Sequence, residues 1–282
     1  MTEGFRAASR LLAAFFAAPL LLAPARAAAQ LRPLEPVEWR VFQGANAFSV
    51  EVGGAAFRDQ RASLAGTEGD LIEAANFTVA WRTGRISLEA AGTGQRFFRD
   101  RRRYAAPDPD GHVDPSIGPR RHDSGDYRIS TAVRLTPDAS RVAALLRFGT
   151  RLPTTDNMTG LDRDATDFFA TVGARGTRGP LALSAEAGLT IVGTRRADFE
   201  QDDLLVYAVR AEYAGGPVTP TLTVLGQQSG SEHRQIRGNE NLGEARLGLR
   251  AGTRRTLRVE LVRGYTPVSP STGVIVAVGT VR

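Results

Sequence analysis

From residue 46 to the last residue, apolar and polar side chains alternate along the chain, and helical periodicity is nearly absent. Because successive side chains of a β-strand point to opposite faces, this pattern predicts strands with one apolar and one polar face. Most of the segments are about ten residues long, which a tilted strand needs to cross a bilayer. The twelve predicted strands are 46–57, 72–82, 85–95, 126–136, 141–151, 166–175, 180–192, 203–213, 218–228, 242–251, 255–265 and 273–282.

The predicted connections alternate between short and long. The short ones are Thr83-Gly84, 137–140, 176–179, 214–217 and 252–254, and the long ones are 58–71, 96–125, 152–165, 193–202, 229–241 and 266–272. A soluble β-sandwich has no reason to sort its loops in this way. Bacterial outer-membrane barrels do, with short turns in the periplasm and long loops outside. The sequence therefore predicts an all-β, antiparallel, up-and-down transmembrane barrel of about twelve strands, with both ends in the periplasm.

Aromatic residues on the apolar faces support the membrane assignment. They form two predicted belts, Phe98, Tyr127, Phe148, Phe168 and Tyr265 beside the long loops and Phe48, Trp81 and Tyr213 beside the short turns. Amphipathic rings favour the headgroup region of a bilayer. Phe57 breaks this phase, and we expect a bulge there. Because lipid cannot hydrogen-bond a free strand edge, the first strand should pair with residues 273–282.

The segment before the strands divides into two predicted parts. Residues 1–29 combine Arg6 and Arg10, a short apolar run and a small-residue stretch, which is the order of a secretory signal peptide. We expect cleavage after Ala27 or Ala29 and export to the cell outer membrane. In the following segment, 30–45, prolines argue against a strand. It is either a periplasmic extension or a plug inside the 46–282 barrel.

Composition removes several classes of protein. The chain has no cysteine, which excludes disulfides and thiol catalysis. Its formal charge is +6, and all its cations other than histidine are arginine, interspersed with acids. This distribution argues against a nucleic-acid partner.

The inward-facing charges give the candidate site. The strand phase directs ten arginines and seven acids into the lumen: Arg82, Arg128, Arg134, Arg147, Arg151, Arg175, Arg210, Arg246, Arg250, Arg258, Glu51, Glu89, Asp167, Glu186, Glu212, Glu244 and Glu260. One interpretation is a polar channel with a weak preference for anions. The other is a set of cross-strand ion pairs that fills and rigidifies the interior. Both can hold together.

Residues 96–125 form the longest predicted loop, which is rich in arginine. These arginines are Arg99, Arg101, Arg102, Arg103, Arg120 and Arg121. They could bind lipopolysaccharide phosphates, or simply keep the loop soluble together with nearby aspartates. The aspartate spacing does not match a calcium loop.

The histidines His112, His122 and His233 all fall in predicted outer loops without metal-ligand spacing. A hydrolase at the barrel rim would need one of them with a partner such as Ser116, Asp123 or Ser229, but no motif joins them. We expect no cofactor, no metal and no enzymatic activity.

One stretch resembles a known family. Arg151, Leu152, Pro153, Thr154 and Asp156, then Thr166 and Asp167, resemble a motif of the MetA-pathway-of-phenol-degradation family of transporter-like outer-membrane barrels. The resemblance implies uptake of hydrophobic or aromatic compounds and brings no catalytic residues. The last strands of outer-membrane barrels usually end with Phe or Trp, but the last strand of this chain does not.

Our leading hypothesis is a channel for small solutes. The alternatives are a structural or adhesion barrel with a closed lumen and a rim hydrolase. The expected partners are outer-membrane lipid, lipopolysaccharide, the barrel assembly machinery and a small solute. The sequence leaves the oligomeric state open.

Overall fold

The computed structural model describes residues 31–42, 46–108, 113–114, 116–138, 140–154, 157–162, 165–193, 203–230 and 240–282. The predicted signal peptide lies outside these residues. In the described part there are thirteen strands: β1 (Asn46–Ala62), β2 (Thr67–Thr83), β3 (Ile86–Arg103), β4 (Arg120–Asp123), β5 (Tyr127–Arg134), β6 (Val142–Leu152), β7 (Asp167–Arg178), β8 (Leu181–Ile191), β9 (Asp203–Tyr213), β10 (Val218–Ser229), β11 (Leu242–Ala251), β12 (Arg255–Gly264) and β13 (Thr272–Val281). Two 3₁₀ turns, η2 (Trp39–Phe42) and η3 (Asn157–Thr159), accompany them.

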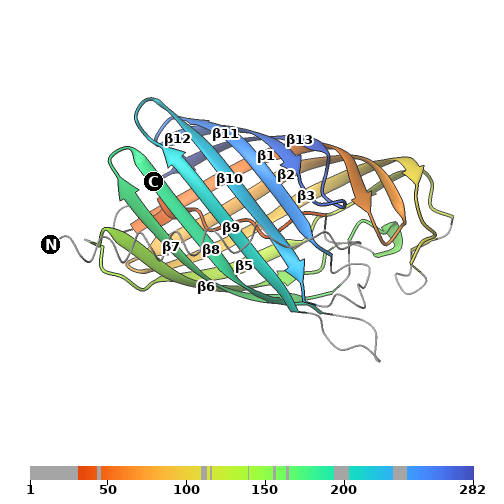
Figure 1. Cartoon of the computed structure of the whole chain (residues 1–282), viewed down its shortest axis with the longest axis horizontal. Helices are drawn as coiled ribbons and strands as arrows, with labels where there is room; N and C mark the ends of the chain where they lie inside the picture. Colours follow the sequence, from red (N-terminus) through yellow and green to blue (C-terminus); the bar gives the residue numbers. More distant parts are fainter. Residues whose placement is uncertain are drawn as a thin grey trace.

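The sheet closes on itself (Figure 1). Each barrel strand pairs antiparallel with its neighbours in the chain, and β1 pairs with β13 from Ser49↔Val281 to Arg58↔Thr272. Among the described residues, the short strand β4 pairs only with the end of β3. Twelve strands therefore form the barrel, which confirms the predicted fold class and the predicted seam.

The outer surface of the barrel is apolar. Large hydrophobic side chains such as Val172, Leu222, Leu247 and Val278 are more than half exposed, which a soluble protein of this size would not tolerate in such numbers. Of the two predicted aromatic belts, every member except Phe98 is exposed on this surface. No helix in the described part of the chain is long and apolar enough to span a membrane.

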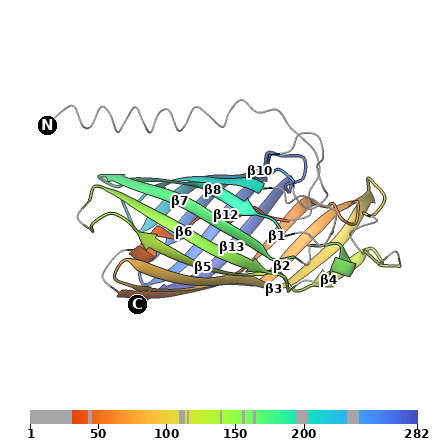
Figure 2. The ribbon, with the colours of Figure 1, turned by 90° about the horizontal axis from the view of Figure 1, so that it is seen from below.

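The prediction of a long loop at residues 58–71 is wrong. The first three strands continue five to eight residues beyond their predicted ends, and the turn between β1 and β2 spans only residues 63–66. These extensions project beyond the rest of the barrel at its long-loop end (Figures 1 and 2). Hydrophobic alternation fades here because the outward positions, such as Arg58 and Asp70, are charged once the strands leave the apolar zone.

A bulge in the wall explains why Phe98 does not face the lipid, although the sequence predicted that it would. On β2, Gly54 pairs with Ala74 and Gly53 with Asn76, so Ala75 is an extra residue, with a left-handed φ of 55°. This conformation costs a non-glycine residue about 1–2 kcal/mol. On β3, Gly94 lies opposite Ala75 outside the ladder.

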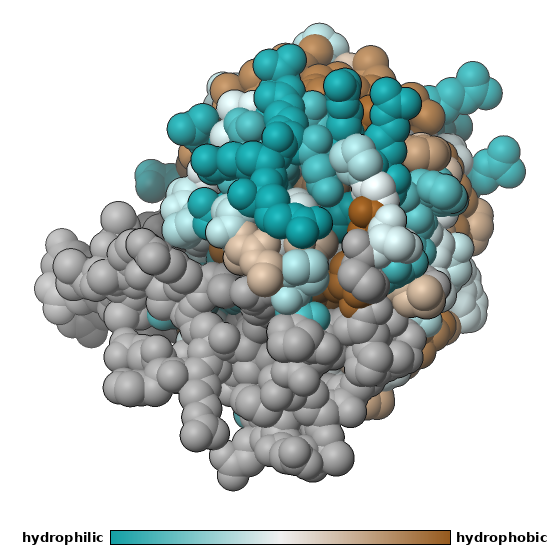
Figure 3. Space-filling view, turned by 90° about the vertical axis from the view of Figure 1, so that its right-hand side faces the viewer, coloured by the Kyte–Doolittle hydropathy of each residue, from teal (hydrophilic) through white to brown (hydrophobic). Residues whose placement is uncertain are grey.

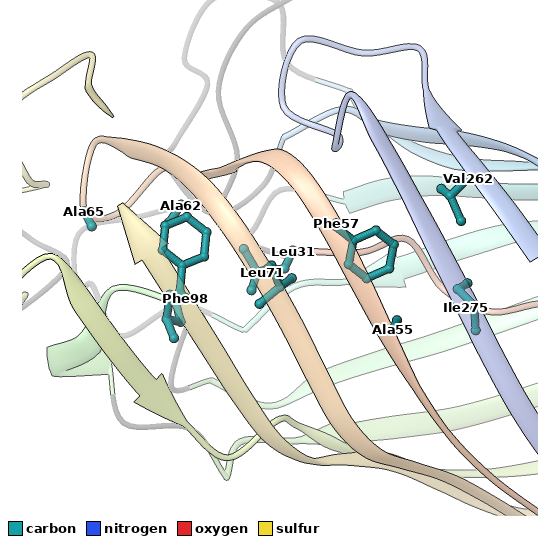
Figure 4. Packing of buried hydrophobic residues seen from close by; sticks show 10 residues of the cluster. Leu31, Ala55, Phe57, Ala62, Ala65, Leu71, Phe98, Val262 and Ile275 are labelled. Carbon is teal, nitrogen blue, oxygen red and sulfur yellow. The ribbon is translucent and has the colours of Figure 1, made fainter. Parts of the chain in front are cut away.

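The bulge reverses the inward and outward faces of β2 and β3 above it. Phe98 is therefore 2% exposed inside the barrel, and Phe97 takes the outward position with 46% exposure. Phe57 also points inward, beside Leu31 and Leu71 (Figure 4).

The expected bulge is present directly after Phe57, at Arg58 and Asp59, where Asp59 has a φ of 53°. It does not turn Phe57 inward, because β1 stays in register with β13 from Ser49 to Arg58.

The outward and inward faces of one strand can be tested with adjacent labels. We expect a spin label at Val79→Cys to collide with oxygen dissolved in lipid. A label at Thr78→Cys, which lines an internal cavity, should collide with a water-soluble nickel reagent instead. The native chain has no cysteine to interfere. Electron paramagnetic resonance power saturation in liposomes measures both, and equal oxygen accessibility at the two sites would contradict the membrane assignment.

Candidate functional site: the barrel lumen

The segment 31–42 lies inside the barrel, and its side chains form ion pairs with the wall. Arg32 donates two hydrogen bonds to Glu244 on β11, from Nε to Oε1 at 2.9 Å and from Nη2 to Oε2 at 2.8 Å. Glu35 accepts two from Arg246 on the same strand, at 2.8 and 2.7 Å. Such paired hydrogen bonds fix both distance and orientation. The first half of the segment is thus held against β11.

The second half forms polar contacts with β8, β9 and β11. The amide of Val37 donates to Glu186 Oε2 at 2.8 Å. Glu38 lies 3.4 Å from Arg210 and 3.5 Å from Arg250. Burial alone would raise the pKa of Glu38, but Arg210 and Arg250 outweigh burial and lower this pKa to about 2. The carboxylate therefore remains charged at all physiological pH values.

Two buried apolar clusters also hold the segment, and the second of them begins at Val37. Leu31 packs into a buried cluster with Phe57 and Leu71 (Figure 4). The guanidinium of Arg32 lies 4.3 Å from the centroid of the Phe57 ring. At the other end, Trp39 and Phe42 pack with residues of β5 and β6. Between these anchors, the contacts with the wall are mainly electrostatic.

All seventeen predicted lumen residues point into the barrel or its ends, and none is exposed. Ten are buried: Arg82, Arg134, Arg147, Asp167, Glu186, Glu212, Glu244, Arg246, Arg250 and Glu260. The half-buried ones are Glu51, Glu89, Arg128, Arg151, Arg175, Arg210 and Arg258. Every one of them is within 4 Å of an oppositely charged group. The interior is accordingly an extended ionic network.

A cavity of about 260 Å³ remains beside the segment. The segment itself forms one side of it. The opposite side is the wall of β13, β1, β2 and β3, where many inward residues are small: Gly53, Ala80, Ala91, Ala277 and Gly279. The middle of the segment lies against β8, β9 and β11, whereas both of its ends also contact β1 and β2.

A second charged cluster lies near the long-loop end. Asp162, which is fully buried, accepts hydrogen bonds from Arg96 at 2.8 Å and Arg151 at 3.2 Å. Arg151 also lies 3.3 Å from Asp126 and 3.1 Å from Asp167. We call these five residues the rim cluster. Through Asp162, the cluster fixes the β6–β7 connection inside the mouth of the barrel.

Acids outnumber arginines in the rim cluster, and the pKa of one carboxyl group, Asp126, is raised. Burial raises the pKa of Asp126, and the neighbouring Asp162 adds to the effect through charge repulsion and a hydrogen bond. Arg151 and Arg96 oppose the rise only in part, and the pKa is about 7. Below about pH 7, the carboxyl group of Asp126 is therefore protonated and forms a hydrogen bond with Asp162.

The family-motif residues surround this cluster. Arg151 is its central cation, and the amide of Thr154 donates to Asp126 Oδ1 at 3.4 Å. Asp167 Oδ1 accepts from the amide of Gly193 at 3.0 Å, where Thr166 also lies close. Leu152 faces outward and Pro153 follows it. Asp156 lies outside the described residues.

Among the described residues, the candidate residues for a rim hydrolase do not lie together. His112 and His233 lie outside the described residues. The exposed His122 and the buried Asp123 are on opposite faces of β4, and Asp123 accepts a hydrogen bond from Thr159 at 2.7 Å. Ser116 donates to Asp114 at 2.7 Å. In the part of the chain that the structure describes, no group of acids or histidines has metal-binding geometry.

Sequence reasoning missed two sets of lumen charges. Glu73 and Arg96 were missed because the bulge at Ala75 reverses the strand faces. Arg32, Glu35 and Glu38 were missed because they precede the first strand. Their spacing of three residues, interrupted by Pro33 and Pro36, is that of one side of a polyproline helix and could have revealed them.

Comparisons support the fold. No family model and no curated protein matches this sequence. Among solved structures, the COG4313 outer membrane channel from Pseudomonas putida F1 superposes with a TM-score of 0.61 and 12% identity, covering 88% of this chain and 100% of that chain. The outer membrane channel DcaP of Acinetobacter baumannii gives 0.43 at 12% identity, over 89% of this chain and 100% of that one. The first likeness shows that this protein has the fold of an outer-membrane β-barrel channel.

The proton shared in the rim cluster predicts a pH dependence of stability. An unfolded aspartate releases its proton near pH ~4. The folded protein retains the proton of Asp126 to about pH 7. The folded state therefore binds more protons between these values, and stability falls as the pH rises through this window. Asp126→Asn mimics the protonated form and should weaken the dependence.

The measurement is the temperature at which the folded band disappears on unboiled gels, after incubation at pH 5 and pH 8. We expect the wild type to lose a few degrees more than Asp126→Asn between the two values. Asp203→Asn, which changes an exposed carboxylate at the start of β9, is the control. An unchanged pH difference in Asp126→Asn would contradict the assignment.

Proposed function

We propose that this protein is an outer-membrane channel for small solutes in which residues 31–42 act as a plug. One observation carries the proposal: ion pairs and two small apolar clusters hold the plug in the lumen, beside a cavity that is lined mainly by the plug and by β13, β1, β2 and β3. Ion pairs between wall and segment can exchange for contacts with water when the segment moves. A purely apolar plug could not leave as readily.

The lining favours polar solutes. Arginines and acids both face the cavity, so a passing molecule would meet paired charges of both signs. Hydrophobic or aromatic cargo, implied by the MetA-pathway resemblance, finds few aromatic side chains around this cavity, among them Phe77 and Phe169. We therefore place small polar solutes first.

One observation favours a second function. Because all seventeen predicted lumen charges are paired, the interior also suits a rigid barrel that conducts nothing. A structural or adhesion role would follow from a lumen that stays closed.

Removing acids from the plug alone provides the test. The double variant Glu35→Ala/Glu38→Ala removes the pairing of Glu35 with Arg246 and of Glu38 with Arg210 and Arg250, and leaves Arg32 with Glu244. Each wall arginine keeps another partner: Arg246 keeps Glu244 at 2.7 Å, Arg250 keeps Glu212 at 2.9 Å, and Arg210 keeps Thr223 at 3.1 Å. The barrel itself should therefore remain intact. We expect severalfold higher conductance, or more frequent openings, in planar lipid bilayers.

Glu51→Ala is the matched control, because it removes an acid from the cavity wall and leaves the plug contacts in place. Its partner Arg258 keeps Glu260 at 2.9 Å. Equal conductance in the double variant and in the control would contradict the proposal that residues 31–42 act as a plug. An absence of current steps in every protein would support the closed barrel instead.

A further inference from the structure

A row of arginines crosses the outer surface where the strands leave the apolar zone. Its members are Arg263 on β12, Arg58 on β1, Arg99 on β3 and Arg120 on β4, and we call them the arginine row. All four side chains are exposed. Arg58 lies opposite Thr272 of β13, and Arg99 opposite both Asp70 of β2 and Arg120. Arg263 donates to the carbonyl of Ser271, whose amide bonds the carbonyl of Arg58.

The row is not neutralised by the protein. In the described part of the chain, the side chains of Arg58, Arg99 and Arg120 have no acidic partner within 4 Å. Asp70 lies between them, but it pairs with Arg101 at 2.9 Å. Arg99 and Arg120 are direct cross-strand neighbours, and like charges in this position are destabilising. Such a pair is expected where an external anion lies between the two cations.

The next outward positions toward the membrane are apolar. They are Leu261, Val274, Ala56, Ile72 and Phe97, which the registers of β12, β13, β1, β2 and β3 place in one continuous line. Leu261 is 60% exposed and Ile72 53%. A ligand that satisfies both rows must have anionic groups above acyl chains.

The row is confined to one side of the barrel. At the long-loop ends of β5 to β9, the outward described residues are Tyr127, Leu152, Phe168, Ile191 and Asp203, and none of them is a cation. Figure 3, which views this end, shows hydrophilic residues gathered on one part of the described surface. Arginines that only kept the rim soluble would be spread around the whole rim. Arginines that bind a specific lipid are needed in one patch.

We infer that the arginine row binds the phosphorylated headgroup of a lipid A-type glycolipid in the outer leaflet. Arginine is suited to this role because its planar guanidinium binds two phosphate oxygens at once. Neighbouring strands are about 4.8 Å apart, so the row offers cations about 5 to 10 Å from one another. More than one phosphate on a single headgroup can then be bound, while the acyl chains lie on Leu261, Ile72 and Phe97.

The experiment compares binding of diphosphoryl lipid A by full-length protein in phosphatidylcholine nanodiscs. In the test variant Arg58, Arg99, Arg120 and Arg263 are all changed to Gln. The matched control changes four exposed arginines near the short turns, Arg85, Arg141, Arg178 and Arg254, to Gln, with the same loss of charge. Retention of the folded band on unboiled gels checks each protein. If the test variant does not fold, Arg99→Gln/Arg120→Gln replaces it.

We expect the test variant to lose about tenfold or more in affinity, because several charge-assisted hydrogen bonds are removed. The control should bind as the wild type does, and dephosphorylated lipid A should bind the wild type as weakly as diphosphoryl lipid A binds the variant. Equal affinity of wild type and test variant, or an equal loss in the control, would overturn the inference. So would inorganic phosphate binding as tightly as lipid A, because the row would then be a site for free anions.

Discussion

A β-sheet in lipid has no solvent to satisfy its edges, so this chain must close the ladder between β1 and β13. The other features depend on that closure. Once the sheet is closed, alternate side chains have only two destinations, the bilayer and a narrow lumen. Apolar residues occupy the first. Every strand then places its polar residues in the narrow lumen, where arginine and acid side chains pair with one another.

The ionic network explains how a segment without regular structure can be held in the lumen. Desolvated charges gain most from partners with matched geometry, and the plug supplies Arg32, Glu35 and Glu38 to a wall that carries Glu244, Arg246, Arg210 and Arg250. Arg246 also pairs with Glu244 and Glu260, and Arg250 with Glu212, so the network does not depend on the plug alone. Under the proposed function, this redundancy allows the wall to persist when the plug moves.

One residue inserted in the wall links the lumen to the outer surface. The bulge at Ala75 turns Glu73 and Arg96 inward, where Arg96 reaches Asp162 in the rim cluster. The same reversal turns Phe97 and Arg99 outward, where one meets the apolar zone and the other belongs to the arginine row. A strained backbone position thereby supplies both the charged mouth of the barrel and the surface proposed to bind lipid.

The amino-acid sequence determined the strands, their order and their closure, because period-two alternation and loop lengths are local signals that membrane insertion makes strict. It also identified lumen charges such as Glu186 and Arg246, which follow from strand phase alone. It could not place Phe98 or Arg96, because a single extra residue at Ala75 reverses two strands and leaves no distinct mark in the pattern. Nor could it choose between an extension and an internal segment for residues 31–42. That choice depends on charges far apart in the chain, 212 residues in the case of Arg32 and Glu244, which only the closed barrel brings together.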